Sequence, residues 1–126
     1  MKLTEINIYP IKSMGSLSLK EANVLKAGLE HDRRWLLLDE NQKFMTQRTV
    51  PEMALVKFQL NENGFKAFYK NDSNNPVFIP FEIPTNAKQM TAQVWDDQVQ
   101  AHKMSAPINE WFSHIFNKEC LSLIHI

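Results

Sequence analysis

The sequence predicts a mostly β fold, an antiparallel β-barrel or sandwich of short strands with one C-terminal amphipathic helix. Two observations carry this prediction. Apolar and polar residues alternate up to about residue 100, and turn-forming residues interrupt the alternation roughly every eight to twelve positions. The period then changes, because a set of apolar residues recurs at the spacing of one helix face: Ile108, Trp111, Phe112, Ile115 and Phe116.

The first predicted strands flank an early proline and a later pair of arginines. Alternation predicts a strand over Leu3–Ile11, which Pro10 ends because proline has no N–H to donate, and another over Leu17–Val24. A further strand is expected to open with Asp32–Arg34 and to continue through Trp35–Leu38. Since that last run is entirely apolar, it fits a strand buried on both faces.

Polar turns divide the rest of the chain. The quartet 39–42 predicts a hairpin turn, and the asparagine-rich segment 71–76 is the clearest predicted loop. Ser105 is expected to cap the C-terminal helix, and Pro107 suits its first turn. The remaining strands are predicted at 44–46, 54–60, 65–69, 77–79, 90–95, 99–104 and 120–126, with a turn at 96–97.

Composition narrows the function classes. A chain of 126 residues has the size of one domain, and 44% hydrophobic content is enough for a core. The 14 basic and 14 acidic residues cancel, and no basic stripe typical of a nucleic-acid-binding protein is present. No apolar run approaches the ~18 residues of a membrane span, and residues 1–5 lack the apolar core of a signal peptide. We therefore expect a cytoplasmic protein that binds neither nucleic acid nor membranes.

The C-terminal segment Leu121–Ile126 is apolar and ends abruptly, whereas the end of a natural domain is usually polar. We interpret residues 1–126 as one domain that is a fragment, whose last strand is cut short or continues into a following domain.

Two segments hold candidate anion-binding residues. Lys12 and Ser13 follow the first strand, and Arg33 and Arg34 precede the buried run. Arginine and lysine both suit phosphate or carboxylate, and arginine can bind it with two hydrogen bonds. Because neighbours in a strand point to opposite faces, only one of the two arginines is expected to face a pocket; the other would face solvent or pair with Asp32 or Glu30. All of these residues also have the composition of an ordinary exposed surface, so the spacing leaves both interpretations open.

A third polar segment, Thr46–Arg48, follows the predicted hairpin and completes a window that contains all three arginines. Its composition suits a ligand-lining loop as well as any other loop. Catalytic and metal-binding patterns are missing: the four histidines have no metal-ligand spacing, and Cys120 has no partner arranged to activate it as a nucleophile. A binding or substrate-shaping domain is therefore easier to defend than a complete enzyme.

Three stretches in series change this picture, because together they resemble the N-terminal β-barrel domain of MOSC proteins. The resemblance covers essentially the whole chain and is strongest over residues 6–56. The stretches are Ile8–Ser13; Gly28–Leu29 with Asp32–Asp39; and Phe44–Arg48 with Pro51 and Ala54–Val56.

The resembled family includes the mitochondrial amidoxime-reducing component and bacterial relatives that act on N-hydroxylated compounds. Its members hold a molybdenum cofactor, a molybdopterin with a phosphate tail, and a C-terminal MOSC domain supplies the cysteine that ligates molybdenum. The resemblance implies that Lys12, Ser13 and Arg33 contact the cofactor phosphate, and that Thr46–Arg48 line the cofactor or substrate side of the pocket. It also implies two partners, the C-terminal MOSC domain and an electron-donor protein.

The 126 residues contain neither that MOSC domain nor its molybdenum ligand, and the resemblance gives no role to Cys120 or Arg34. We therefore predict no catalytic or metal-binding residue here and an inactive fragment, whose parent is a molybdenum-dependent oxidoreductase that reduces N-oxygenated compounds. Two alternatives stay open. The chain is a stand-alone, non-catalytic module that binds an anionic small molecule or protein, or it binds pyridoxal phosphate, for which Lys12 would be the Schiff-base lysine.

Overall fold

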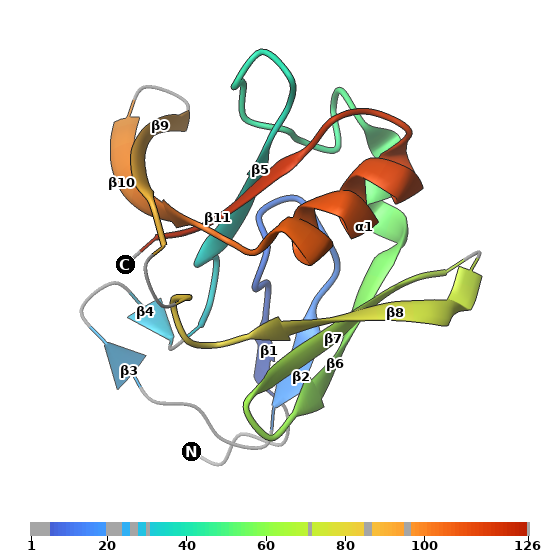
Figure 1. Ribbon diagram of the computed structural model, residues 1–126. Helices are drawn as coiled ribbons and strands as arrows, with labels where there is room; N and C mark the ends of the chain where they lie inside the picture. Colours follow the sequence, from blue (N-terminus) through green and yellow to red (C-terminus); the bar gives the residue numbers. More distant parts are fainter. Residues whose placement is uncertain are drawn as a thin grey trace.

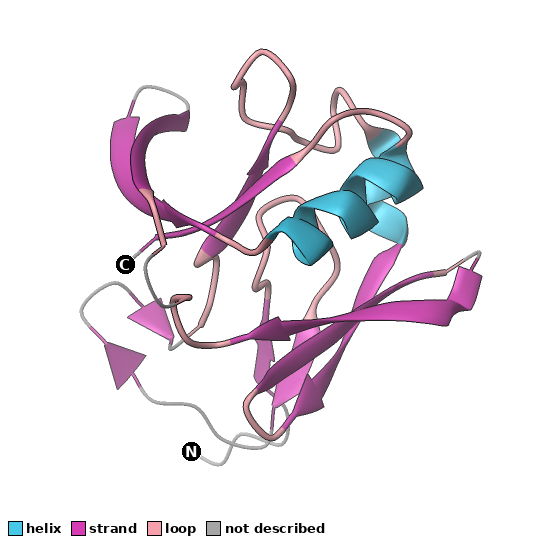
Figure 2. Ribbon diagram, viewed as in Figure 1, coloured by secondary structure: helices cyan, strands magenta, loops and turns pink. Residues whose placement is uncertain are grey.

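The computed structural model describes residues 6–19, 24–25, 28–29, 31–70, 72–84, 87–94 and 97–125. Strands dominate these residues, with one α-helix near the C-terminal end, as Figure 2 shows. The elements in chain order are β1 (Ile6–Ile8), β2 (Leu17–Leu19), β3 (Val24–Leu25), β4 (Gly28–Leu29), β5 (Trp35–Leu38), the 3-10 helix η1 (Pro51–Leu55), β6 (Val56–Asn61), β7 (Gly64–Tyr69), β8 (Asp72–Pro80), β9 (Gln89–Val94), β10 (Asp97–Lys103), α1 (Ala106–Phe116) and β11 (Leu121–His125).

All pairings between these strands are antiparallel, which confirms the predicted fold class. The largest sheet has the order β5-β11-β10-β9 and curls into half of a barrel (Figure 1). A second sheet has the order β6-β7-β8, and β1-β2 and β3-β4 form two short ribbons. The helix α1 lies between β11 and β8, so it covers the space between the two larger sheets (Figure 1).

The strand β5 joins two hydrophobic cores. Trp35 and Leu37 belong to the main core, together with Phe65 and Phe112, whereas Leu36 and Leu38 point the other way into a smaller core. All four residues of β5 are at most 2% exposed, which confirms the predicted strand buried on both faces. Each such side chain contributes about 1.5–3 kcal/mol through burial, so β5 is held firmly in place.

The helix α1 matches its predicted pattern. Ile108, Trp111 and Phe112 are buried, and the indole of Trp111 donates a hydrogen bond of 2.6 Å to the Asn75 carbonyl of β8. Ser105 stands at the N-cap position, but its side chain makes no capping hydrogen bond, so that part of the prediction is wrong.

The predicted loop at 71–76 is also wrong, because β8 begins at Asp72 and continues to Pro80. This strand is at the edge of its sheet, and it pairs with β7 through a register shift between Ala67 and Tyr69. An edge strand tolerates proline and exposed asparagines, since one side of its backbone needs no partner strand. β7 pairs with Asp72 and with Val77–Pro80, so pairing on both sides of the asparagines carries the strand across them and overrides their turn propensity.

Other element boundaries differ from the predictions. Asp32–Arg34 do not open a strand, because residues 31–33 form a turn and β5 begins at Trp35. The strand expected at 44–46 is reduced to a single bridge between Leu38 and Phe44, and the expected strand at 54–60 begins only after η1. The predicted strand positions Leu3 and Ala22 and the turn residue Asp96 lie outside the described residues.

Candidate functional site

Two segments far apart in the sequence are joined side by side at the end of β1. The backbone N–H of Arg33 donates to the Tyr9 carbonyl at 2.7 Å, and that of Trp35 donates to the Pro10 carbonyl at 3.0 Å. In return, the N–H of Lys12 donates to the Trp35 carbonyl at 3.0 Å. Proline suits this place because the bonds use its carbonyl and not the N–H that it lacks. These backbone bonds bring the side chains of Lys12 and Ser13 close to that of Arg33.

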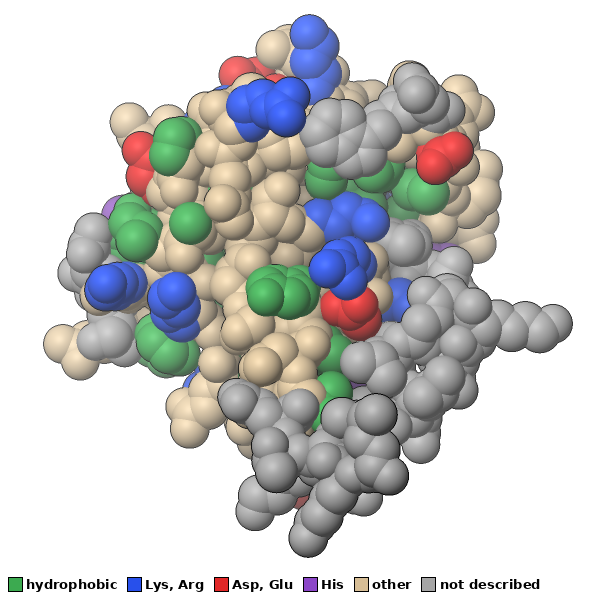
Figure 3. Space-filling model, turned by 180° about the vertical axis from the view of Figure 1, so that it is seen from behind, with side chains coloured by type: hydrophobic (Ala, Val, Ile, Leu, Met, Phe, Trp, Pro, Cys, Tyr) green, Lys and Arg blue, Asp and Glu red, His purple; other side chains and the backbone are tan. Residues whose placement is uncertain are grey.

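Their junction forms a pocket of about 300 Å³, which we call the basic pocket. It is lined by Tyr9, Lys12, Ser13, Met14, Arg33, Phe44 and Gln47. Seen from behind, the molecule has basic side chains beside an acidic one near the middle of the surface (Figure 3). Lys12, Ser13 and Arg33, the three residues expected to contact a phosphate, therefore line one pocket.

The third predicted segment enters the pocket only in part. Gln47 lines it, and its side-chain amide donates a hydrogen bond of 2.6 Å to the Ser13 carbonyl. Thr46 and Arg48 are not among the lining residues. The carbonyl of Thr46 instead accepts hydrogen bonds from the N–H groups of Thr49 and Val50, at 3.1 and 2.9 Å, so this residue holds the turn together.

Sequence reasoning missed the apolar part of the pocket. Tyr9, Met14 and Phe44 supply its apolar walls, and Tyr9 is 41% exposed, which is unusual for a large aromatic residue. One sequence signal pointed to Tyr9. It stands directly before Pro10, ahead of the segments that carry Lys12 and Arg33.

The carboxylate of Asp32 lies where the two segments meet. One of its oxygens accepts a hydrogen bond of 2.8 Å from the N–H of Tyr9, and the other is 2.6 Å from the Arg33 guanidinium. That guanidinium lies 5.3 Å from the centre of the Tyr9 ring, within the range of a cation–π contact. Arg33 therefore both faces the pocket and pairs with Asp32. The alternation of side chains along a strand had predicted these two roles for different arginines.

Two pocket residues have a left-handed backbone. The φ angle is 69° at Ser13 and 53° at Arg33, a region that residues other than glycine adopt at a cost of about 1–2 kcal/mol. Next to them Gly15 is close to β6: its N–H donates to the Val56 carbonyl at 3.2 Å, and a Cβ atom on Gly15 would lie only 2.7 Å from that oxygen. The turn that carries Lys12 and Ser13 is thus anchored at both ends.

The basic pocket disfavours the charge of its own lysine. Burial lowers the pKa of Lys12 below its ordinary value of 10.5, and the nearby Arg33 lowers it further, while Asp32 acts in the opposite direction. Among the described residues, no acidic side chain forms an ion pair with the Lys12 ammonium. An anion in the pocket would relieve this repulsion between Lys12 and Arg33.

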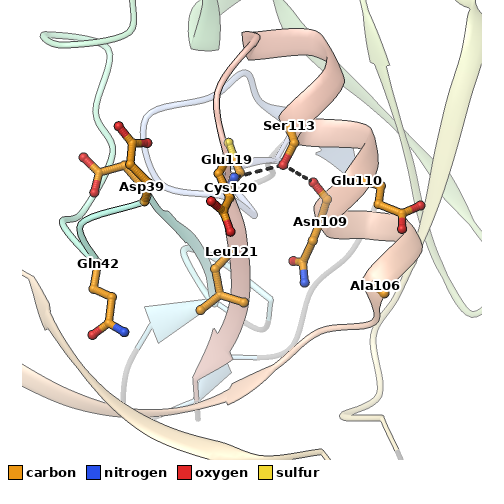
Figure 4. Close-up of a pocket in the computed structure, with 10 residues that line it drawn as sticks. Asp39, Gln42, Ala106, Asn109, Glu110, Ser113, Glu119, Cys120 and Leu121 are labelled. Carbon is orange, nitrogen blue, oxygen red and sulfur yellow. Dashed lines mark hydrogen bonds between the residues drawn. The ribbon is translucent and has the colours of Figure 1, made fainter.

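A larger hollow of about 490 Å³, which we call the acidic pocket, lies between α1, β11 and the turn after β5 (Figure 4). It is lined by Asp39, Glu40, Gln42, Ala106, Asn109, Glu110, Ser113, Glu119, Cys120 and Leu121. No lysine or arginine is among these residues.

Polar side chains of the acidic pocket hold the fold together. The Asn109 side-chain oxygen accepts hydrogen bonds from the N–H and the hydroxyl of the buried Ser122, at 2.6 and 2.5 Å. The Ser113 hydroxyl donates to the Asn109 carbonyl at 2.8 Å and accepts from the N–H of Cys120 at 2.9 Å (Figure 4). Burial raises the pKa of the Cys120 thiol from 9.0 to about 11, so the thiol stays protonated and unreactive near neutral pH.

Within the part of the chain that the structure describes, no group of three or more histidine, cysteine or acidic side chains could hold a metal ion. Nor does any helix among the described residues have the length and apolar character needed to cross a membrane.

The chain is similar in sequence to known proteins over most of its length. Residues 1–119 match the family model of the MOSC N-terminal beta barrel domain. The molybdenum cofactor sulfurase of Solanum lycopersicum is 28% identical over 96% of this chain, and that of Arabidopsis thaliana is 27% identical over 94%. The human molybdenum cofactor sulfurase is 24% identical over 94% of the chain.

The chain spans only 13–15% of the length of these three relatives. A solution structure of a Bordetella bronchiseptica protein has a similar fold, with a TM-score of 0.61 and 15% identity over 83% of this chain and 88% of that one. Since the family model covers nearly the whole sequence, the chain belongs to the MOSC N-terminal beta barrel domain family.

Proposed function

We propose that residues 1–126 are the N-terminal domain of a MOSC-type molybdenum enzyme and that the basic pocket binds the phosphate end of the molybdenum cofactor. In this proposal Lys12, Ser13 and Arg33 contact the phosphate, and Gln47 forms part of the pocket wall. One observation supports the proposal above all others: Lys12 and Arg33 line the same pocket although they come from different segments of the chain.

The chemistry of the pocket fits a phosphate. Two cations with one neighbouring carboxylate leave a positive pocket, and the guanidinium and ammonium groups are both good phosphate donors. At about 300 Å³ the pocket is at the lower end of the range for small-molecule sites, so it takes the phosphate end and leaves the rest of the cofactor to another domain. A MOSC domain that follows in the full-length protein is the natural candidate to hold the rest of the cofactor. When bound, the cofactor would supply two-electron redox chemistry at its molybdenum.

For the reaction of the parent enzyme we keep two candidates. The resemblance to the amidoxime-reducing component supports reduction of N-oxygenated compounds with electrons from a separate donor protein. The names of the relatives support sulfuration of the cofactor instead. An assay of the full-length protein with an N-hydroxylated substrate and, separately, with desulfo cofactor distinguishes the two reactions.

Pyridoxal phosphate is a second candidate ligand, and the lowered pKa of Lys12 favours it, because Schiff-base lysines react as neutral amines. Borohydride reduction of the protein mixed with pyridoxal phosphate, followed by mass spectrometry, would locate the modified lysine. Modification spread over many lysines contradicts this candidate. A stand-alone anion-binding module remains the third interpretation, and a stop codon directly after residue 126 would favour it.

The decisive experiment measures cofactor content. In the full-length protein, Arg33→Ala and Lys12→Met should each lower the molybdenum and pterin content of the purified enzyme by about 10-fold, the effect of losing one charge-assisted hydrogen bond. Arg48→Ala is the matched control, because Arg48 is exposed and does not line the basic pocket. Unchanged molybdenum content in both pocket variants would refute the proposal.

A further inference from the structure

We propose that Asp32 is a positioning residue of the basic pocket: its carboxylate holds the Arg33 guanidinium in place for an anion. The inference rests on the proposed function only in that it concerns the same pocket. It assigns a role to a residue that would not touch the anion itself.

Asp32 contacts both segments that form the pocket. Asp32 uses both of its oxygens, one on the N–H of Tyr9 at 2.8 Å and the other on the Arg33 guanidinium at 2.6 Å. One carboxylate therefore links the backbone of the first segment to the side chain of the second. Since the guanidinium also lies 5.3 Å from the Tyr9 ring centre, two neighbours fix its position.

Arg33 and Asp32 differ in how far their side chains are exposed to solvent. The Arg33 side chain is 56% exposed, whereas that of Asp32 is only 19% exposed. An exposed arginine normally samples many rotamers, and ordering it costs free energy when a ligand binds. A shielded carboxylate that bonds the guanidinium in advance removes part of this cost, so the arginine is preorganised.

Asp32 also affects the neighbouring lysine. Lys12 experiences the Arg33 charge and the Asp32 charge with opposite signs, and the carboxylate helps the ammonium to stay protonated. Asp32 thus supports both cations of the pocket, Arg33 by a direct bond and Lys12 through its field.

Asp32→Asn is a test in which a positioning role and a simple charge effect predict opposite changes in the affinity for phosphate. The asparagine keeps an oxygen for the N–H of Tyr9 but offers the guanidinium an amide instead of a charge. If Asp32 acted only as a negative charge near an anion site, its neutralisation would tighten phosphate binding. The positioning role predicts the reverse, a loss of roughly 5- to 10-fold in affinity for inorganic phosphate.

Asp32→Glu separates the two effects a second time, because it keeps the charge and moves the carboxylate by one methylene group. A positioning role predicts weaker phosphate binding here too, whereas a pure charge effect predicts an unchanged phosphate affinity. Asp39→Asn is the matched control: that carboxylate accepts hydrogen bonds from the N–H groups of Asn41 and Lys43, and it does not line the basic pocket.

The experiment is a titration of this chain with inorganic phosphate, followed by NMR at the amides of Lys12, Ser13 and Gln47. Two readings need no phosphate: the Lys12 pKa, expected to fall in Asp32→Asn because the carboxylate that raises it is lost, and the order of the Arg33 Nε–H group, expected to decrease in both variants. Unaltered order of Arg33 in both variants, or phosphate affinity at or above that of the wild type in both, would overturn the inference.

Together with the molybdenum measurement, this experiment keeps the two proposals apart. If the wild type binds phosphate and Asp32→Asn weakens that binding, but the full-length Arg33→Ala and Lys12→Met variants keep their molybdenum content, the proposed function fails and the positioning role stands. If the wild type binds phosphate and neither variant changes affinity or order, the positioning role fails and the proposed function stands.

Discussion

The acidic pocket is the larger of the two hollows, yet the basic pocket is the better candidate for ligand binding. In the acidic pocket, the side chains of Asn109 and Ser113 carry hydrogen bonds that join α1 to β11. In the basic pocket, the bonds that join the segments use backbone groups of Lys12, Ser13 and Arg33 together with the side chains of Gln47 and Asp32, so the Lys12 ammonium takes no part in them. A pocket's volume therefore says less about its role than which of its atoms hold the fold.

The largest expected effect is on stability, and it belongs to the acidic pocket. Asn109→Ala removes the acceptor of two hydrogen bonds from Ser122, which is only 3% exposed. Leaving these donors unpaired should lower the free energy of unfolding by about 2–4 kcal/mol, measured by urea denaturation. Glu110→Gln, on the exposed face of the same helix, should change it by less than about 0.5 kcal/mol. Equal stability of the two variants would contradict this structural role of the Asn109 side chain.

The second effect depends on pH and concerns Cys120. Because its pKa is raised from 9.0 to about 11, the folded state prefers the neutral thiol; the stabilisation is complete below pH 9 and is lost as the pH rises from 9 to 11. The loss should reach about 2–3 kcal/mol, since the side chain is buried. The difference in unfolding free energy between the wild type and Cys120→Ala, measured at pH 8 and pH 11, isolates this contribution. A difference that does not change with pH would contradict the shift.

The smallest effect is a gain of stability in the basic pocket. Ser13 has a φ of 69°, so Ser13→Gly should relieve strain and raise the free energy of unfolding by about 0.5–1 kcal/mol in thermal unfolding. Asn117→Gly, at the left-handed cap of α1 with φ 50°, should gain less, because asparagine tolerates this conformation. No gain at Ser13 would show that this turn is not strained.

The elements that the sequence predicts well are those whose own pattern determines their burial. The helical spacing from Ile108 to Phe116 and the unbroken apolar run Trp35–Leu38 each describe one surface of the core, so α1 and β5 were predictable. The edge strand β8 was not, because its asparagines have turn propensity, and the pairing with β7 on either side of them, at Asp72 and at Val77–Pro80, comes from the tertiary fold. Local propensity cannot include a partner strand.

The candidate site was predictable to a similar degree. Residue type and family resemblance together selected Lys12, Ser13 and Arg33, whereas their spacing alone favoured an ordinary surface. The contribution of Asp32 depends on a turn at residues 31–33 and on a bond to Tyr9, both of which come from the tertiary fold. The exclusion of Thr46 and Arg48 from the pocket has the same origin, because the turn that begins at Thr46 determines which of its side chains face inward.

The burial of β5 on both faces has an electrical consequence. Arg33 precedes this strand and Asp39 follows it, so an extended backbone holds a cation and a carboxylate roughly 15–20 Å apart, at about 3.3 Å per residue. Through solvent that separation is about two screening lengths at physiological salt. The formal charges of the chain sum to zero, yet the residues that line the basic pocket include two cations and no acid, and those that line the acidic pocket include four acids and no cation, so a charged ligand at either pocket meets lining side chains of one sign.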